Sequence, residues 1–354
     1  MRSCPPKTRN RTVAAVILAV ATTTLNVVGC APAPSISPAR SAAATDAPPS
    51  VQVHILVGVP GAMRLASVMG GAAGSGGHIE PASPATGRPD PAGSGGLDGV
   101  PDDARWMSGS PTVGYVATSR DTGRIYASGP VAPGSPAAWR EVVLHGPAPA
   151  ALAAPRSFAV LSPDGASIAA LAGTPGSGRT DARLLLIERA TGTTRAIALG
   201  ESLDGRPPVW MGTDRVAVAL RDRDDRRLLA MVDGASGTIR ARAGNGGCLA
   251  VSGDGSTVVS TDPDTVDSVA TGPTDDFAAG SHLTDAPIGN TAHQTPAQLL
   301  LDGSGSTLAV AWLDDAGDTT AIGVYSKGTL GWTLLFEAPL PADATRAVLV
   351  DFDE

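Results

Sequence analysis

Few side chains in this sequence could perform chemistry, because its 354 residues include only five histidines and three cysteines. The densest group of possible ligands and bases is His282 and His293 with Asp275, Asp276 and Asp285. Imidazoles and carboxylates together could hold a metal ion or transfer protons. Residues 271–296, which contain the group, are rich in Pro and Gly, so a long loop between strands is the simpler interpretation. No nucleophile elbow, Walker loop, His-Glu-x-x-His or Cys-x-x-Cys motif is present, and we predict no catalytic residue, metal or cofactor.

Three other places carry reactive or charged groups. Residues 262–267 offer carboxylates for Ca²⁺ but lack the glycine and the final Glu of an EF-hand loop. Residues 221–227 alternate Arg and Asp, which favours a solvated turn over a docking patch. Cys248 precedes an apolar run, so we expect a small core residue, the alternative being a reactive thiol.

The remaining cysteine of interest is Cys30, at the end of an export signal. Four basic residues precede an apolar run over about residues 13–28, which is short for a membrane-spanning helix. Val27-Val28-Gly29-Cys30 resembles the lipobox of bacterial lipoproteins. The resemblance implies cleavage after residue 29 and acylation of Cys30 as the first mature residue, which anchors the chain in the membrane. The alternative is a secretory signal with a coincidental Cys.

Composition divides the rest of the chain. Residues 30–50 are rich in Pro and Ala and form a tether. Residues 51–354 are the folded domain, and residues 70–105, with long Gly-rich runs, are predicted to be a flexible insertion in which His78 is solvated. Loss of the signal lowers the formal charge from −8 to −12, since residues 1–29 hold four basic residues and no acid. An acidic chain without a basic stripe is a poor nucleic-acid binder.

A repeated β-hairpin organises the folded domain. In residues 158–171, two apolar runs flank Ser162-Pro163-Asp164-Gly165, where Pro fixes one turn dihedral and Gly accepts a positive φ. Degenerate copies start near residues 106, 209, 248 and 297, and their second strands begin at Val113, Ile168, Val216, Val258 and Leu308. These starts are 55, 48, 42 and 50 residues apart, the period of β-propeller blades.

A second hairpin follows the first in most copies. Residues 184–187 turn into 195–199, residues 228–232 turn into 239–240, and residues 322–325 turn into 332–336. Two hairpins per period give the four strands of a blade. The sequence therefore predicts an all-β propeller of four-stranded blades.

The chain ends on an apolar run, residues 347–352, that repeats the first strand of a blade but has no strands after it. Residues 51–57 and 63–69 are a hairpin without a first strand. Pairing the two ends closes the ring and removes exposed sheet edges. This count gives six blades. Five or seven blades are the alternatives, because the repeat cannot be followed through residues 70–105 and 262–296.

The Ser162-Pro163-Asp164-Gly165 hairpin and the later Thr-Gly turns resemble TolB-like and WD-repeat propellers over about residues 106–352. There is no Trp-Asp dipeptide, and the only Gly-His pair, Gly77-His78, lies in the Gly-rich stretch, so the WD-repeat tetrad cannot be carried over. The resemblance implies a propeller whose relatives include binding scaffolds, peptidase accessory domains and a few enzymes.

These features favour a lipid-anchored lipoprotein on the extracytoplasmic face of the cell membrane, with the propeller as a noncatalytic binding platform. The expected partners are the membrane, through Cys30, and a protein, peptide or glycan of the cell envelope, but not nucleic acid. The alternative is a propeller hydrolase or lyase that uses His145, His282 and His293 together with acidic residues.

Overall fold

The computed structural model describes residues 51–353, apart from residues 82–102, 147–155, 174–181 and several shorter gaps. The described residues lie in the unit Ala47–Glu354 and form six antiparallel sheets and one short helix. The prediction of an all-β propeller with six four-stranded blades is confirmed.

The first sheet joins the two ends of the folded domain. Its order is β25 (Arg346–Asp353), β1 (Gln52–Val59), β2 (Ala62–Met69) and β3 (His78–Pro81). Val53 lies opposite Phe352, and Leu56 lies opposite Val348. The predicted pairing of residues 347–352 with residues 51–57 is therefore confirmed.

The other five sheets follow in chain order, and each repeats the same up-and-down path. The second sheet comprises β4 (Ala104–Ser110), β5 (Gly114–Ser119), β6 (Ile125–Ala127) and β7 (Arg140–Glu141). The third comprises β8 (Arg156–Leu161), β9 (Ser167–Ala172), β10 (Arg183–Glu188) and β11 (Thr194–Ala198). In the fourth, the first strand is split into β12 (Ser202–Leu203) and β13 (Val209–Met211), before β14 (Arg215–Arg221), β15 (Arg227–Asp233) and β16 (Ile239–Gly244). The fifth comprises β17 (Leu249–Val251), β18 (Thr257–Thr261), β19 (Ser268–Pro273) and β20 (Thr284–Pro287), and the sixth β21 (Thr295–Leu301), β22 (Thr307–Leu313), β23 (Thr319–Lys327) and β24 (Trp332–Pro339).

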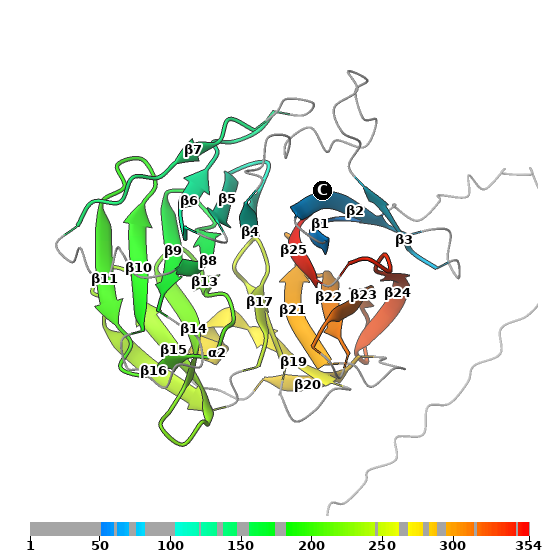
Figure 1. The fold of residues 1–354 in the computed structure, drawn as a ribbon. Helices are drawn as coiled ribbons and strands as arrows, with labels where there is room; N and C mark the ends of the chain where they lie inside the picture. Colours follow the sequence, from blue (N-terminus) through cyan, green and yellow to red (C-terminus); the bar gives the residue numbers. More distant parts are fainter. Residues whose placement is uncertain are drawn as a thin grey trace, which may run out of the picture. The chain divides into compact units, whose positions relative to one another are not determined.

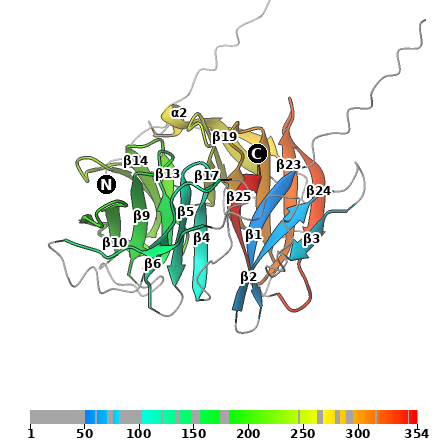
Figure 2. The same ribbon diagram turned by 90° about the horizontal axis from the view of Figure 1, so that it is seen from above.

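The sheets follow one another around a ring (Figure 1). The first strands β25, β4, β8, β13, β17 and β21 each contact the next, and β21 contacts β25 again. Figure 2 shows the red strand β25 between cyan β4 and blue β1. The ring thus closes by hydrogen bonds between chain ends, which leaves no gap between the first and last blades.

Several middle strands of the blades are buried along nearly their whole length because neighbouring sheets cover both of their faces. In β9, every residue after Ser167 is buried, and in β5 all six residues are buried. An alternating pattern is expected only where one face meets water. Alanines at many of these positions let adjacent sheets approach closely, as at Ala169 and Ala170.

In the third blade, the turn between β8 and β9 is stabilised by hydrogen bonds from its own side chains to its backbone. The Ser162 hydroxyl donates to Asp164 Oδ1 at 2.6 Å, and that oxygen accepts the Ala166 amide at 3.0 Å. Gly165 has φ +68°, which L side chains rarely adopt. The local sequence therefore specifies this hairpin, as predicted.

Two predicted loops contain regular structure. β3 lies inside the Gly-rich stretch 70–105 and pairs with β2 from Met69 opposite His78 to Ala66 opposite Pro81, so the prediction of one continuous flexible insertion was wrong there. The predicted loop 271–296 contains α2 (Thr274–Ala278) and β20, the outer strand of the fifth blade. Both strands are short and owe their conformation to a neighbouring strand rather than to local propensity.

Among the described residues, no helix has the length and apolar character needed to cross a membrane.

Candidate ligand-binding site

A cavity of about 710 Å³ lies among the first strands of all six sheets, and we call it the axial cavity. Ligand pockets for small molecules commonly have volumes of about 300–1,000 Å³. The repeat turns also line it, through Ser162 and Pro163, Ser252 and Gly253, and Asp302 and Gly303. The repeat that builds the fold therefore also builds the wall of this cavity.

Three buried polar side chains meet on one wall. His54 Nδ1 lies 2.7 Å from Asp351 Oδ1, and the Tyr115 hydroxyl donates to Asp351 Oδ2 at 2.7 Å. The three residues are 3%, 5% and 1% exposed and come from β1, β25 and β5. His54 Nε2 lies 3.4 Å from the side-chain nitrogen of Gln52, which also donates to the Ser67 hydroxyl at 3.1 Å. Hydrogen bonds of this kind offset the cost of burying a carboxylate.

The lining carries an excess of negative charge. Among the lining residues that the structure describes, those that can carry a charge near neutral pH are His54, Asp302 and Asp351, and none is Lys or Arg. Asp302 Oδ1 accepts the amides of Ser306 and Thr307, so its carboxylate holds the turn. Asp351 is consequently the carboxylate that the cavity itself presents.

Aromatic rings are concentrated around the same cavity. The chain has five Trp, three Tyr and four Phe, and four of these rings line it: Trp106, Tyr115, Trp210 and Phe352. Trp210 Nε1 donates to the Val160 carbonyl at 3.2 Å, which fixes the orientation of its ring. The lining is thus a largely apolar surface with four aromatic rings, and the polar wall of His54, Tyr115 and Asp351 forms one part of it.

Gln298 lines the cavity from β21, the first strand of the sixth blade, which lies next to β25. Its Nε2 donates to the Leu349 carbonyl, and its Oε1 accepts the Leu349 amide, both at 2.9 Å. The register of β21 shifts between Pro296 and Gln298, and such a bulge re-aims a side chain. The amide therefore ties the sixth blade to the closing strand.

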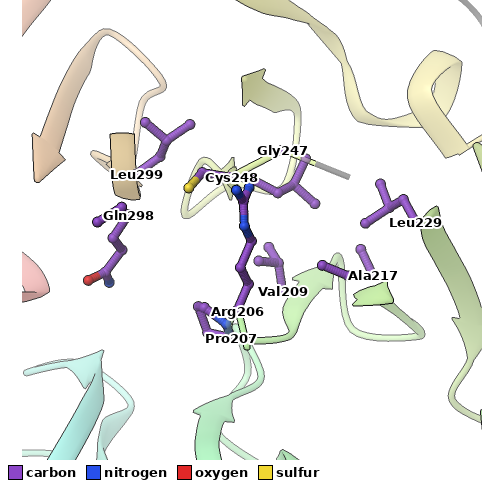
Figure 3. Close-up of a pocket in the computed structure, with 12 residues that line it drawn as sticks. Arg206, Pro207, Val209, Ala217, Leu229, Gly247, Cys248, Gln298 and Leu299 are labelled. Carbon is purple, nitrogen blue, oxygen red and sulfur yellow. The ribbon is translucent and has the colours of Figure 1, made fainter. Parts of the chain in front are cut away.

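A second, much smaller cavity of about 20 Å³ lies between the fourth and fifth blades, beside Cys248 and Arg206. Figure 3 shows the Arg206 guanidinium pointing toward Cys248. The Cys248 sulfur donates to the Pro296 carbonyl at 3.3 Å. Burial raises the pKa of the Cys248 thiol, with the nearby Arg206 charge opposing, so the thiol is protonated at neutral pH. This volume suits one water molecule rather than a substrate.

A buried carboxylate beside the small cavity gathers three arginines. Asp204, whose side chain is 1% exposed, contacts Arg206 at 3.2 Å and Arg227 at 3.7 Å, and it hydrogen-bonds Arg221. Arg221 and Arg227 frame the β14–β15 turn, and Arg221 also pairs with Asp225 at 2.9 Å. The turn predicted for residues 221–227 is present, but its two end arginines neutralise a carboxylate outside the run, which the sequence pattern did not indicate.

The histidine and acid group singled out in the sequence is only partly described. His282 and His293 lie outside the described residues, as do Cys30 and residues 262–267. Asp275 in α2 pairs with Arg215 at 3.0 Å, and His145 is an exposed residue whose backbone pairs with Thr193 beside β11. Within the described part of the chain, no group of three or more His, Cys, Asp or Glu side chains is placed to hold a metal ion.

No protein-family profile matches the sequence, and no curated protein sequence matches it. Solved structures do resemble the fold. The β-propeller domain of Cps50 (Swd1) from Myceliophteria thermophila has a TM-score of 0.46 and 11% identity, covering 66% of this chain and 72% of that one. The C-terminal WD40 domain of Sif2 has a TM-score of 0.43 and 11% identity over 85% and 86% of the two chains. The WD40 domain of Toxoplasma gondii coronin has a TM-score of 0.44 and 13% identity over 80% and 68%.

The residues of the polar wall were not identified from the sequence. A signal was present, because His54 and Asp351 each interrupt an otherwise apolar run, in Val-His-Ile-Leu and in Val-Leu-Val-Asp-Phe. Polar residues inside runs that are buried on both faces need partners. Since the two runs were expected to pair, the two interruptions could have been matched.

Proposed function

We propose that the protein is a lipoprotein held at the extracytoplasmic face of the cell membrane by a lipid on Cys30, and that its propeller is a noncatalytic binding platform for a protein, peptide or glycan. The axial cavity is the observation that supports the platform most strongly. It is open to ligand-sized molecules, it is lined by rigid strands, and most of its lining is apolar.

The chemistry of the described lining favours binding over catalysis. The hydroxyls of Ser162 and Ser252 donate to Asp164 and Asp254 in their own turns, at 2.6 and 2.5 Å. The pKa of each of these two carboxylates is lowered, by the Ser hydroxyl and a turn amide, so each is a poor base for activating a hydroxyl. These serines stabilise turns.

The rival function, a hydrolase or lyase, has one observation in its favour, the His54–Asp351 pair at the cavity wall. An Asp-oriented imidazole can act as a base when its second nitrogen faces the reacting group. Here that nitrogen faces the Gln52 amide. If an enzyme used this pair, His54→Gln would abolish a measurable turnover, and if it used the histidines predicted from the sequence, the triple variant with His145, His282 and His293 changed to Ala would lose it. The platform keeps full binding in the triple variant.

The anchor is tested by changing Cys30 to Ala in cells fed an alkyne-tagged fatty acid. The label should disappear, and the protein should leave the membrane fraction or stay unprocessed. Cys4→Ala, in the segment expected to be removed, is the matched control and should label normally. Equal labelling of the Cys30→Ala protein would refute the anchor.

The platform is tested by photo-crosslinking in cells. A photoreactive amino acid at Thr112, an exposed residue that lines the axial cavity, should yield specific adducts. The control position is Thr333, which is exposed on the outer strand β24. Equal adducts at both positions, or none at Thr112, would contradict the platform.

A further inference from the structure

We propose that the axial cavity is a binding site for an organic ammonium ion, a protonated amine on an apolar or aromatic body, with Asp351 as the counter-charge. This inference rests on the proposed binding function and names the chemical class that the cavity selects.

Charge is the first step of the argument. Of the described lining residues that can carry a charge near neutral pH, Asp302 and Asp351 are carboxylates and His54 is an imidazole. Even with His54 protonated, two negative charges face one positive charge. An anionic ligand would find neither Lys nor Arg among the described lining residues, and a buried unpaired charge is costly.

Asp351 is positioned to receive a donor. Its carboxylate is 5% exposed and accepts one hydrogen bond at each oxygen, from Tyr115 and from His54. A carboxylate has about four acceptor positions, so both oxygens can accept another donor. Those two bonds fix its orientation before a ligand arrives, which lowers the entropy cost of binding.

The rings supply the second half of an ammonium site. Trp106, Tyr115, Trp210 and Phe352 line the cavity that Asp351 lines. The face of an aromatic ring attracts a cation within about 6 Å of its centroid, and Trp does so best. A carboxylate together with aromatic faces discriminates an ammonium from an alcohol of the same shape.

The test compares three probes that share one body: 1-naphthylmethylamine, 1-naphthalenemethanol and 1-naphthoate. Binding to the full chain is measured by titration calorimetry at pH 7. The amine should bind at least about tenfold more tightly than the alcohol, and the carboxylate should bind least, because only the amine adds charge pairing and cation–π attraction. Equal binding of amine and alcohol, tightest binding of the carboxylate, or no binding of any probe would overturn the inference. N-acetyl-lysine methylamide, as a fourth probe, shows whether a lysine side chain can supply the same ammonium.

Two variants locate the site. Asp351→Asn should reduce the amine's advantage over the alcohol to within about threefold. A second variant is needed because Asp351 also helps to close the ring. Ala132 is exposed, lines the cavity and is not part of the polar wall, so the large ring of Ala132→Trp should weaken the binding of all three probes by filling part of the cavity. Unchanged amine binding in Ala132→Trp would overturn the inference. Thr333→Trp, on the outer strand, is its matched control.

The two proposals fail in different ways. Crosslinks at Thr112 without amine selectivity would retain the platform and reject the ammonium site. Amine selectivity without crosslinks would retain the ammonium site and reject a macromolecular platform.

Discussion

His54 Nδ1 in β1 lies 2.7 Å from Asp351 Oδ1 in β25, although the two residues are 297 positions apart in the chain. The contact places a buried polar pair on the seam where the ring closes, beside the axial cavity. Asp351 also accepts a hydrogen bond from Tyr115 of the second blade, so the Asp351 carboxylate connects three strands from two blades. Closure of the ring and the proposed ammonium site therefore share one side chain.

The polar pair should stabilise the fold measurably. Changing one partner of a buried pair typically costs about 3–5 kcal/mol, so His54→Gln and Asp351→Asn should each lower the free energy of unfolding by an amount of that order. The double variant should lose clearly less than the sum of the two, when measured by urea unfolding. His78 and Glu80 provide the control, since they lie 3.3 Å apart but are 55% and 62% exposed, and their coupling should be below about 1 kcal/mol. Additive losses for His54 and Asp351 would mean that the contact does not stabilise the closed ring.

The repeat turns should tolerate an exchange of their polar residues. In the third blade the order is Ser162-x-Asp164, whereas in the sixth it is Asp302-x-Ser304, and there the Ser304 hydroxyl donates back to Asp302 at 2.9 Å. The double exchange Ser162→Asp with Asp164→Ser should therefore keep the free energy of unfolding within about 1 kcal/mol of the parent.

Each single change is the control for this exchange. Ser162→Asp places two carboxylates in one turn, and Asp164→Ser removes the acceptor of the Ala166 amide, so each should cost about 1–2 kcal/mol. A double variant as unstable as the worse single variant would show that the two orders are not equivalent.

Acid should weaken the propeller through three turn carboxylates. The Ser162 hydroxyl and the Ala166 amide lower the pKa of Asp164, and the Ser252 hydroxyl and the Ser256 amide lower the pKa of Asp254. For Asp302, burial raises the pKa, but the Thr307 amide with the Ser306 and Ser304 groups outweighs it, and the net pKa is lowered.

A lowered folded-state pKa means that the unfolded chain binds more protons. The stabilisation is therefore complete above the unfolded-state pKa of about 3.9 and is lost as the pH falls through the lower folded-state pKa. Urea unfolding between pH 2 and 7 should show this slope, and replacing the three Asp residues with Asn should flatten it. Asp276→Asn, in α2 and outside these turns, should keep the parent slope; a triple variant with an unchanged slope would contradict the assignment.

Cys248 should behave as a core residue. Its thiol is 4% exposed with a raised pKa, so alkylation by iodoacetamide at pH 8 should be at least about a hundredfold slower in the native protein than in urea, because local opening must come first. The experiment uses a protein with Cys4 and Cys30 changed to Ala. The variant Thr333→Cys in that background supplies an exposed thiol for comparison. If native Cys248 were alkylated as quickly as that exposed thiol, Cys248 would be an accessible, reactive group and the expectation would be wrong.

Local sequence chemistry predicted most of the fold. The turn at Ser162-Pro163-Asp164-Gly165 contains all of its hydrogen-bonding partners within six residues, so its conformation is readable without the rest of the chain. Strands with both faces covered, such as β9, are long apolar runs, and their recurrence made the period visible. The pairing of the chain ends followed because only those two segments lacked blade partners.

The candidate site could not be predicted in the same way. His54 and Asp351 lie opposite each other in the β1–β25 pairing, which could be matched from the sequence, but Tyr115 joins them from the next blade. Asp204 gathers Arg221 and Arg227 from the two sides of the β14–β15 hairpin and Arg206 from the segment before β13. No local spacing encodes the contact with Tyr115 or the cluster around Asp204. β3 escaped notice for a related reason, since a four-residue strand ending in Pro has little propensity of its own and is held by β2.

Closure of the ring between the chain ends is the claim on which the cavity and both proposals depend, and thermal unfolding of a protein that lacks residues 346–354 tests it most directly. The deletion removes β25, in which Val348, Leu349 and Val350 are buried, and each such side chain contributes roughly 1.5–3 kcal/mol. The loss approaches the 5–15 kcal/mol by which a typical domain is stable, so the truncated protein should aggregate or melt far below the parent. Residues 88–97 lie outside the described residues and within the insertion predicted from the sequence. If that prediction holds, their removal, a deletion of similar length, should change the Tm little, because loop entropy varies slowly with length. A truncated protein that melts with the parent's Tm would contradict the closed ring.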